Sequence, residues 1–478
     1  MQLPDGWVVV LKRDCPTCTL VEPVLHQLAG AGELSVYSQD DPDFPAGLPV
    51  VDDRELETSW RLQVDTVPTL LRVEDGTEVA RTVGWLRSSW EELTGVTGLG
   101  PDLPDHRPGC GSRSVEWGVE EELDRRYGER VLTSRTVELA DLEDEHEAAY
   151  ARGWTDGLPV VPPTEARVLA MLTGTTRAPD EVVAVVPPDL VPCTVEKVAV
   201  NAVLAGCLPE HLPVVLAAVA AACTDGFNMH GVLATTMPAG PVIVVNGPVA
   251  QAIGMNSGVN ALGQGNRANA TIGRALQLVV RNVGGGRPGE VDRGSQGQPG
   301  KYTACFAEDE AGSPFDPLAA SRGVEGSALT LFAGCGWWPV VDQLSRTPES
   351  LARSLAASLR GVGHPKLAIV FDALLVLSPE HGRVFREAGW DRARLLAELE
   401  GLLTVPAAEL SRGVDGMAEG MPPAMIAGWG EAVPLPKFRP GGLLIAHAGG
   451  TAGLFSTIVP GWVSGAGGSE PTTVPIGA

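Results

Sequence analysis

Short apolar runs and helical patterns alternate along the first 95 residues. Runs rich in Val and Leu predict buried strands, and apolar residues spaced three and four apart predict helices. An Asp-Gly pair between two alternating runs predicts a hairpin. The predicted order is strand, helix, strand, helix, hairpin and closing helix: Trp7–Lys12, Pro16–Leu28, Leu34–Tyr37, Asp53–Leu62, Val67–Val73 with Glu78–Val83, and Ser88–Leu93.

From Trp154 onward the chain becomes rich in Ala, Val, Gly and Pro and poor in charge. Helical patterns and strand-like runs still alternate, which predicts an α/β architecture for this part as well. The predicted helices are Thr164–Leu172, Thr194–Ala205, Leu212–Cys223, Ala268–Arg281 and Asp391–Leu403, and the predicted strands are Val242–Val245, Leu367–Leu377 and Leu443–His447. We therefore expect an N-terminal domain (1–95), a linker with acidic helices at Glu116–Arg130 and Ala140–Ala151 (96–150), and a large α/β domain (151–478).

The net charge of −24 is concentrated at the N-terminal end. Residues 1–150 carry 31 acidic and 13 basic residues, a balance of −18, and the remaining residues carry 28 and 22, a balance of −6. An acidic field repels nucleic acid and anionic lipid, so we expect neither as a partner. The chain shows no signal-peptide pattern and no apolar run of membrane-spanning length, so we expect a cytoplasmic protein without a membrane partner. In that compartment its eight cysteines predict catalysis or metal binding rather than a disulfide scaffold.

The clearest chemical motif is Asp14-Cys15-Pro16-Thr17-Cys18, at the junction of a predicted strand and a predicted helix. Free N–H groups at the start of a helix stabilise a thiolate on the first cysteine. That thiolate is the nucleophile of disulfide exchange. The second cysteine lies one turn further on, where it can attack the resulting mixed disulfide. The motif therefore predicts a redox-active Cys15–Cys18 pair.

A second motif, Thr66-Val67-Pro68-Thr69, lies before the hairpin. Together with the cysteine pair at a strand–helix junction, it resembles the thioredoxin family over the first fifth of the chain. The resemblance implies a cis-proline at Pro68 that faces the cysteine pair and helps to dock a substrate chain. The motif CPTC and the start of the chain at the strand before it depart from thioredoxin itself.

A third cysteine, Cys110, lies between two glycines in a Pro/Gly-rich segment. Arg107 and Arg113 are close in sequence and can favour its thiolate. Its position after the thioredoxin-like domain makes Cys110 a candidate electron acceptor from Cys15 and Cys18; the alternative is a loop cysteine without chemistry. The string from Cys110 to Arg113 resembles the Cys/Sec-Gly-Ser-Cys motif of a bacterial (seleno)protein family, with Arg113 in the place of the second cysteine. The string from Asn246 to Lys301 resembles part of a bacterial domain family of unassigned activity that is associated with UGSC-type proteins and would cover roughly residues 150–478. Neither resemblance implies a particular reaction.

Gly-rich polar segments in the large domain predict a site for a small anionic substrate. Glycines before a helix leave its N–H groups free for an anion, and arginines add charge-assisted hydrogen bonds. The alternative for each segment is a turn with a helix cap. The candidate binding residues are Asn246, Asn256, Asn266, Arg267, Asn269, Arg274, Arg287 and Lys301. His230 is a candidate acid/base and Cys305 a candidate second thiol, whereas no metal site is indicated.

These patterns lead to the hypothesis of a thiol-dependent oxidoreductase. The thioredoxin-like domain, recharged by a cellular dithiol reductant, would supply electrons to the large domain for a step such as cleavage of a carbon–heteroatom bond. No cofactor beyond the Cys15–Cys18 disulfide is evident, and a homo-oligomer is compatible with the sequence. The alternatives are a disulfide reductase for a protein partner and a thiol protein that handles a metal or organometal.

Overall fold

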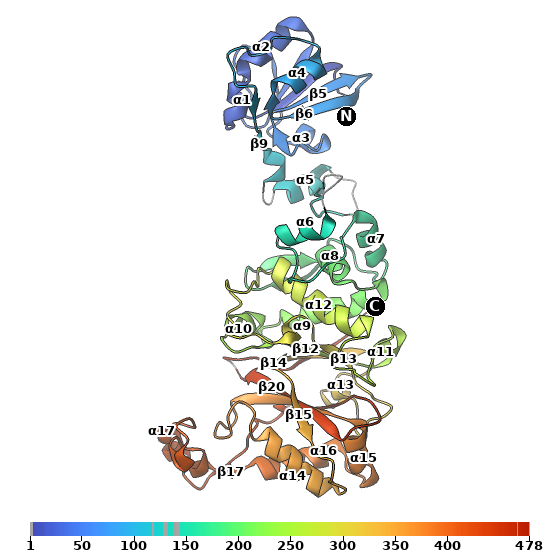
Figure 1. Ribbon diagram of the computed structural model, residues 1–478, viewed down its shortest axis with the longest axis vertical. Helices are drawn as coiled ribbons and strands as arrows, with labels where there is room; N and C mark the ends of the chain where they lie inside the picture. Colours follow the sequence, from blue (N-terminus) through green and yellow to red (C-terminus); the bar gives the residue numbers. More distant parts are fainter. Residues whose placement is uncertain are drawn as a thin grey trace. The chain divides into compact units, whose positions relative to one another are not determined.

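Helices and strands alternate along the chain in sheets of mixed direction, which confirms the predicted α/β class (Figure 1). The computed structural model describes residues 3–116, 119–127, 132–137, 139, 144–465 and 467–477. The chain divides into two units, Met1–Val137 and Glu138–Ala478. Among the described residues, no helix combines the length and the apolar character that a membrane crossing requires.

The N-terminal unit is built on a five-stranded sheet of order β3-β2-β1-β5-β6. Strand β1 pairs in parallel with β2 and antiparallel with β5, and the β5–β6 pair is the predicted hairpin. The strands are β1 (Gly6–Leu11), β2 (Leu34–Ser38), β3 (Val50–Asp52), β5 (Thr69–Glu74) and β6 (Thr77–Val83). Strand β1 is therefore central, and its carboxyl end leads directly into the cysteine motif.

The predicted helix Pro16–Leu28 is divided into α1 (Pro16–Leu20) and α2 (Glu22–Ala31). The division falls at Val21 because Pro23 occupies the first turn of α2, where its missing N–H group is tolerated. The other helices of this unit's core are α3 (Glu57–Arg61) and α4 (Arg87–Thr94).

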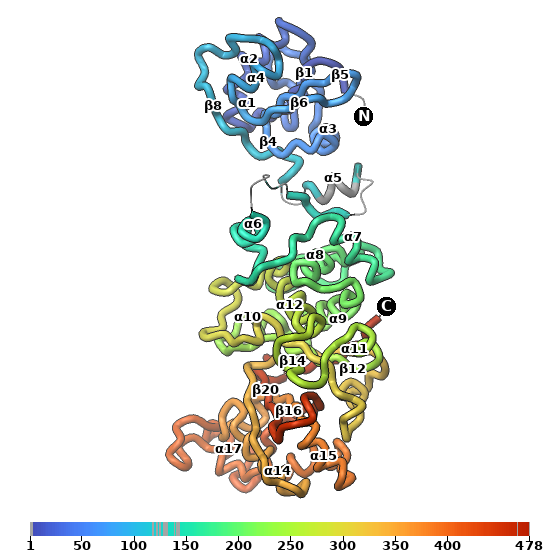
Figure 2. Tube along the Cα trace, turned by 45° about the vertical axis from the view of Figure 1, so that its right-hand side comes forward, coloured from blue at the N-terminus to red at the C-terminus, as the bar shows by residue number. Residues whose placement is uncertain are grey.

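The segment after α4 belongs to the N-terminal unit rather than to a linker. Strand β7 (Trp85–Leu86) pairs with β8 (His106–Arg107), and β4 (Thr66–Val67) pairs with β9 (Cys110–Gly111). Figure 2 shows β8 beside α1 at the side of this unit. The predicted boundary at residue 95 is too early, because two strands of the Pro/Gly-rich segment, β8 and β9, pair with strands β7 and β4 of the N-terminal unit.

The large unit contains two groups of three strands with the same order. In the first group β12 (Gly240–Asn246) lies between the parallel β13 (Cys305–Ala307) and the antiparallel β14 (Ala328–Gly334). In the second, β16 (Phe371–Leu377) lies between the parallel β19 (Leu443–His447) and the antiparallel β20 (Phe455–Val463). The groups join where Gly334 pairs with Gly461.

Helices cover the outer face of each strand group (Figure 1). Inner-face side chains from both groups, such as Val244, Phe332, Leu374 and Val459, form one buried cluster. Successive side chains along these strands therefore point alternately into this inner core and toward a helix-covered face. Helices α8 (Val195–Ala205), α9 (Leu212–Ala222) and α12 (Arg267–Asn282) lie on one side, and α14 (Pro348–Leu359), α15 (Pro379–Glu387) and α16 (Arg392–Leu403) lie on the other.

Several predicted elements differ in extent from the structure. The apolar run Leu367–Leu377 forms strand only from Phe371, because Ile369 has a positive φ of 55°. The acidic helices are α5 (Val119–Tyr127) and α6 (Glu145–Ala151), and residues 117–118, 128–130 and 140–143 of the predicted ranges lie outside the described residues. The remaining elements are α7 (Glu165–Leu172), α10 (Met229–Ala234), α11 (Pro248–Ala252), α13 (Leu318–Ser321), α17 (Pro423–Trp429), β10 (Val182–Val186), β11 (Val191–Thr194), β15 (Trp338–Val341), β17 (Val405–Pro406), β18 (Pro434–Leu435) and β21 (Thr472–Pro475).

Candidate redox site

Cys15 lies between β1 and α1, where it is the N-cap residue of the helix. Its sulfur accepts a hydrogen bond from the backbone N–H of Cys18, with an N–S distance of 3.3 Å. Its Sγ also lies 3.6 Å from the carbonyl oxygen of Val67, and the Val67–Pro68 peptide bond is cis, as the resemblance implied. The structure therefore brings the predicted Cys15, Cys18 and Pro68 together at one site.

Cys110 is the third cysteine of this site. In the β4–β9 ladder it is the register partner of Val67, it packs against the buried cluster that contains Cys15 and Cys18, and its side chain is among the groups that lower the pKa of Cys15. Cys15 and Cys18 are 1% and 0% exposed, whereas Cys110 is partly accessible. All three cysteines are free thiols. Of the three, Cys110 is thus the thiol that a molecule in solution can reach.

The surroundings of the three thiols separate their acidities. The pKa of Cys15 is lowered to about 5, and the largest cause is a hydrogen bond from the Cys18 side chain. Burial of Cys15 acts in the opposite direction. The side chain of Cys110 and the N–H groups of Cys18 and Thr17 lower the pKa further. The pKa of Cys18 is raised, first by burial and then by its hydrogen bond to Cys15. Burial likewise raises the pKa of Cys110. Cys15 is therefore the thiolate at neutral pH and the two others are protonated donors.

The prediction that Arg107 and Arg113 favour a thiolate at Cys110 is wrong. Burial and the hydrogen bond to Cys15 raise the pKa of Cys110 instead. The guanidinium of Arg113 donates to the carbonyl oxygen of Gln39 at 2.9 Å, so it holds the backbone rather than the sulfur.

The predicted substrate residues before and within α12 serve the fold. Asn266 caps α12 by accepting from the N–H of Asn269, and Asn269 in turn accepts from the N–H of Asn256. Arg267 donates to the carbonyl oxygen of Gly206. These contacts correspond to the alternative of a turn with a helix cap.

Two predicted cationic binding residues are paired with carboxylates. Arg274 holds Asp156 through two hydrogen bonds of 2.8 and 2.7 Å, and Lys301 Nζ lies 2.6 Å from Asp292 Oδ1. Burial alone would raise the pKa of Asp156, but Arg274 lowers it below the ordinary value. Both cations therefore already neutralise an anion of the chain itself.

The three remaining predicted residues, His230, Arg287 and Cys305, differ in their exposure to solvent. His230 and Arg287 are exposed. Cys305 is buried in β13, and burial raises the pKa of its thiol, which keeps it protonated. The structure does not favour Cys305 as a nucleophile.

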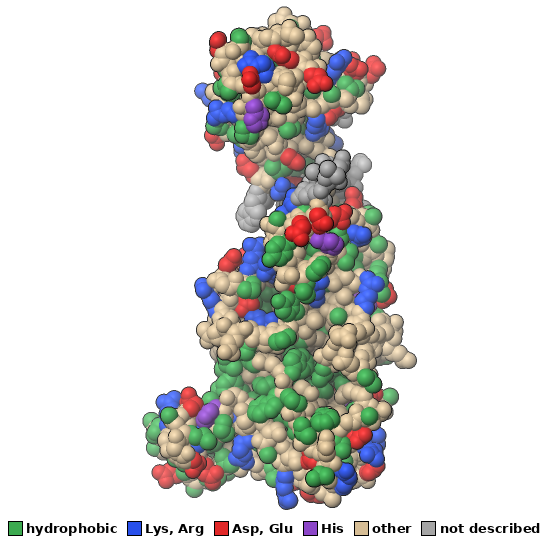
Figure 3. Space-filling view, in the orientation of Figure 1, with side chains coloured by type: hydrophobic (Ala, Val, Ile, Leu, Met, Phe, Trp, Pro, Cys, Tyr) green, Lys and Arg blue, Asp and Glu red, His purple; other side chains and the backbone are tan. Residues whose placement is uncertain are grey.

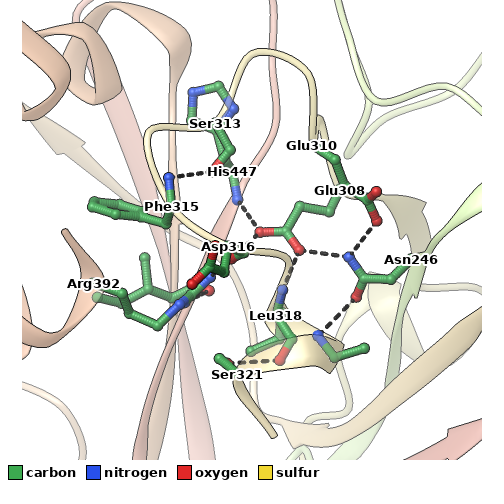
Figure 4. Close-up of polar contacts among 12 residues, drawn as sticks. Asn246, Glu308, Glu310, Ser313, Phe315, Asp316, Leu318, Ser321, Arg392 and His447 are labelled. Atoms are coloured by element: carbon green, nitrogen blue, oxygen red, sulfur yellow. Dashed lines mark hydrogen bonds and ion pairs between the residues drawn. The ribbon is translucent and has the colours of Figure 1, made fainter. Parts of the chain in front are cut away.

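Asn246 belongs to a buried polar cluster at the ends of β12, β13 and β19 (Figure 4). Its Nδ2 donates to Glu308 Oε2 at 2.6 Å and to Glu310 Oε1 at 2.9 Å. Glu308 also accepts from the N–H groups of Leu318 and His447, at 2.7 and 3.2 Å. Burial raises the pKa of Glu308, and these donors oppose the shift. The cluster joins the two strand groups of the large unit.

A pocket of about 360 Å³ lies beyond the carboxyl ends of the parallel strands β16 and β19. Ser378 follows β16, the loop 448–453 follows β19, and residues 260–263 complete the wall. A smaller hollow of about 240 Å³ shares Leu262 and Thr457 with it. Figure 3 shows hydrophobic side chains gathered over β15 and β20. None of these lining residues is among the candidate residues predicted from the sequence, although the Gly-rich run 449–453 after a predicted strand is a usable signal.

Comparison of the chain with protein-family models, with curated proteins and with solved structures finds no match. Within the described part of the chain, no group of three or more His, Cys, Asp or Glu side chains has the arrangement of a metal site.

Proposed function

We propose that the protein is a thiol–disulfide oxidoreductase whose centre is Cys15 and Cys18, in a thioredoxin-like N-terminal unit. The observation that carries the proposal is the position of Cys15 as the N-cap of α1, where its sulfur accepts a hydrogen bond from the N–H of Cys18 at 3.3 Å. The side chains of Cys18 and Cys110 are among the groups that lower the pKa of Cys15. A sulfur so surrounded is stabilised as the thiolate, which is the attacking species in disulfide exchange.

The reaction follows from the separation of the three pKa values. The Cys15 thiolate attacks a disulfide R–S–S–R′, forms a mixed disulfide with R–S and releases R′–S⁻. Cys18, which is close enough to donate to Cys15, then loses its proton and attacks the Cys15 sulfur. The Cys15–Cys18 disulfide forms, R–S⁻ leaves and takes a proton, and the substrate disulfide has gained two electrons. A cellular dithiol would reverse these steps to regenerate the enzyme.

Oxidation of the full-length chain by a small disulfide tests this assignment. Reduced protein is incubated with oxidised glutathione, quenched with an alkylating reagent and mapped by mass spectrometry. We expect a Cys15–Cys18 disulfide in the wild type, no reaction at Cys18 in Cys15→Ser, and wild-type behaviour in the control Cys335→Ser, whose pKa is raised by burial to about 12. Formation of the same amount of oxidised Cys18 in Cys15→Ser overturns the proposal.

For the large unit, we propose binding of a small molecule in the pocket beyond β16 and β19. The position supports this, because ligands of α/β folds bind outside the carboxyl ends of parallel strands. The expected anionic class is tested by thermal shift with phosphate, sulfate and small carboxylates. Thr457→Trp, at the start of β20, fills the pocket, and Thr451→Trp, in the 448–453 loop but outside the lining, is the control. A shift that survives Thr457→Trp refutes the pocket, and no shift with any anion refutes the class.

A further inference from the structure

The segment that carries Cys110 is fixed at both ends by backbone pairing. At one end β8 pairs with β7, and at the other β9 pairs with β4, with Val67 opposite Cys110. Strand β4 precedes the cis peptide bond and its Val67 carbonyl contacts Cys15. The register therefore places Cys110 at the Cys15 sulfur rather than elsewhere on the surface.

Glycines permit the segment to lie this close. A Cβ on Gly109 would come within 2.3 Å of Thr66 Cγ2 and 2.7 Å of the Val67 carbonyl oxygen. Gly84 has a φ of +68°, and a Cβ there would come within 2.8 Å of the backbone nitrogen of Gly109. Only residues without a Cβ allow the backbones to approach to this distance.

Further hydrogen bonds, from side chains and from the backbone, hold the segment on either side of Cys110. Thr17, between the two cysteines of the pair, donates from Oγ1 to the carbonyl oxygen of Pro108 at 2.7 Å. After Cys110, the N–H of Ser112 donates to the carbonyl oxygen of Asp65 at 2.9 Å, and Gln39 Nε2 donates to Ser112 Oγ at 2.6 Å. Buried hydrogen bonds of this kind hold one conformation.

The segment occupies the place that an incoming protein chain would need. An extended peptide binds a sheet edge by adding a strand, and β9 already adds that strand to β4. Cys15 is 1% exposed under this cover. A disulfide in another protein cannot approach Cys15 unless the segment leaves, whereas Cys110 is in place.

From this arrangement we propose that residues 106–111 are a built-in substrate strand and that Cys110 passes its oxidising equivalent to Cys15. This deepens the proposed function, on which it rests: the immediate substrate of the Cys15–Cys18 pair is a mixed disulfide between Cys110 and a small-molecule thiol. The lowered pKa of Cys15 agrees with its role as the thiolate that attacks the Cys110 mixed disulfide.

Each step of the transfer balances. A small-molecule disulfide R–S–S–R oxidises Cys110: the Cys110 thiol loses its proton and forms Cys110–S–S–R, and one R–S⁻ leaves. The Cys15 thiolate then attacks the Cys110 sulfur, so that the Cys15–Cys110 bond forms and the second R–S⁻ leaves. Finally Cys18 loses its proton and attacks the Cys15 sulfur, and Cys110 leaves as a thiolate that takes up a proton. The net result is one Cys15–Cys18 disulfide, one R–SH and one R–S⁻, because Cys15 enters as the thiolate and Cys18 supplies the one proton released.

The intermediate is tested in the full-length Cys18→Ser variant, which cannot complete the last step. After oxidation with oxidised glutathione, alkylation and peptide mapping, we expect a Cys15–Cys110 disulfide in Cys18→Ser, and a Cys15–Cys18 disulfide with alkylated Cys110 in the wild type. A Cys18→Ser chain that holds glutathione on Cys15 while Cys110 is alkylated overturns the inference and leaves the proposed function standing. A chain in which Cys15 is never oxidised overturns both.

Two glycine variants test the role of the segment without removing a sulfur atom. In the Cys18→Ser background, Gly109→Ala forces the segment from β4, and Gly111→Ala, whose added Cβ meets nothing within 4 Å, is the matched control. We expect Gly109→Ala to lower the rate of Cys15–Cys110 formation at least about tenfold, because the two sulfurs lose their enforced proximity. It should also speed alkylation of Cys15. Equal rates in both glycine variants overturn the role of the segment.

Discussion

The Sγ atom of Cys15 lies 3.6 Å from the carbonyl oxygen of Val67. Val67 is also the register partner of Cys110, so one residue of β4 organises both cysteines. The acidity of Cys15 depends on this arrangement, because one of the groups that lower its pKa is the side chain of Cys110. The pKa of Cys15 can therefore be measured as a property that depends on Cys15, Cys18 and Cys110 together.

We predict that Cys15 titrates near its lowered pKa of about 5 in the reduced protein. Thiolate absorbance in the ultraviolet, followed against pH, should show one cysteine ionised far below the ordinary value of about 8.5. Cys18→Ala should raise that midpoint most, since Cys18 is the first cause of the shift, and Cys110→Ala should raise it less. Cys223→Ala is the control, because burial raises the pKa of Cys223 to about 12. An unchanged midpoint in both Cys18→Ala and Cys110→Ala would contradict the assignment.

The same shift makes the stability of the reduced N-terminal unit depend on pH. Cysteine titrates near pH 8.5 in an unfolded chain, roughly, and Cys15 near about 5 in the folded one. The stabilisation by the Cys15 thiolate is therefore fully present above the unfolded pKa and is lost as the pH falls toward the folded one. Hydrogen exchange of the β1 amides, compared between wild type and Cys15→Ala, should show a difference that grows with pH across this window. A difference independent of pH would be inconsistent with a lowered Cys15 pKa.

Much of the fold of the N-terminal unit could be predicted from local patterns. The strand Trp7–Lys12 and the hairpin around Asp75-Gly76 appear as β1 and β5–β6. The segment 96–113 could not be assigned in this way, because β8 and β9 have two residues each and their partners β7 and β4 are distant in sequence. Such short pairings depend on contacts between segments that are distant in sequence, so the hydrophobic periodicity of the sequence does not predict them.

In the large unit, the composition of a binding site could be read from local sequence, but the contacts of its residues could not. Polar residues in Gly-rich segments have the composition of a binding site, and the sequence could indicate that composition. Whether Arg274 faces a ligand or Asp156 depends on a contact across 118 residues. Helix capping by Asn266 and ion pairing by Arg274 satisfy the same donors that an anion would use. Local sequence cannot separate these two uses.

We predict that Arg274→Ala destabilises the large unit. The side chains of Arg274 and Asp156 are 14% and 13% exposed, and the pair is bidentate. Removing the cation leaves a largely buried carboxylate unpaired, which costs on the order of 3 kcal/mol. Arg177→Ala is the control, because the Arg177–Glu181 pair is more exposed, and its loss should cost less than about 1 kcal/mol. Urea unfolding of the full-length chain measures both, and equal stability of the two variants would indicate that Arg274 serves a ligand rather than the fold.

We predict that Asn246→Asp destabilises the large unit in a pH-dependent manner. The amide Nδ2 of Asn246 donates to both Glu308 and Glu310, so a carboxylate oxygen in its place would face two other carboxyl groups. The one donor that the structure shows at the remaining oxygen, the N–H of Ala319, does not separate these charges. The introduced group must take up a proton in the folded state, so its pKa is raised above the unfolded value of about 3.9. The penalty is absent below that unfolded pKa and grows as the pH rises, to more than about 3 kcal/mol near neutral pH.

Asn256→Asp is the matched control for this prediction, because the Asn256 side chain donates to the carbonyl oxygen of Val259 and accepts from the N–H of Gly258. Its effect should vary little with pH, since no carboxylate is among these partners. The measurement is the urea midpoint of both variants and the wild type at several pH values between about 4 and 8, the interval over which the carboxyl group ionises. Parallel midpoint curves for the two variants would show that the Asn246 amide does not separate the Glu308 and Glu310 charges.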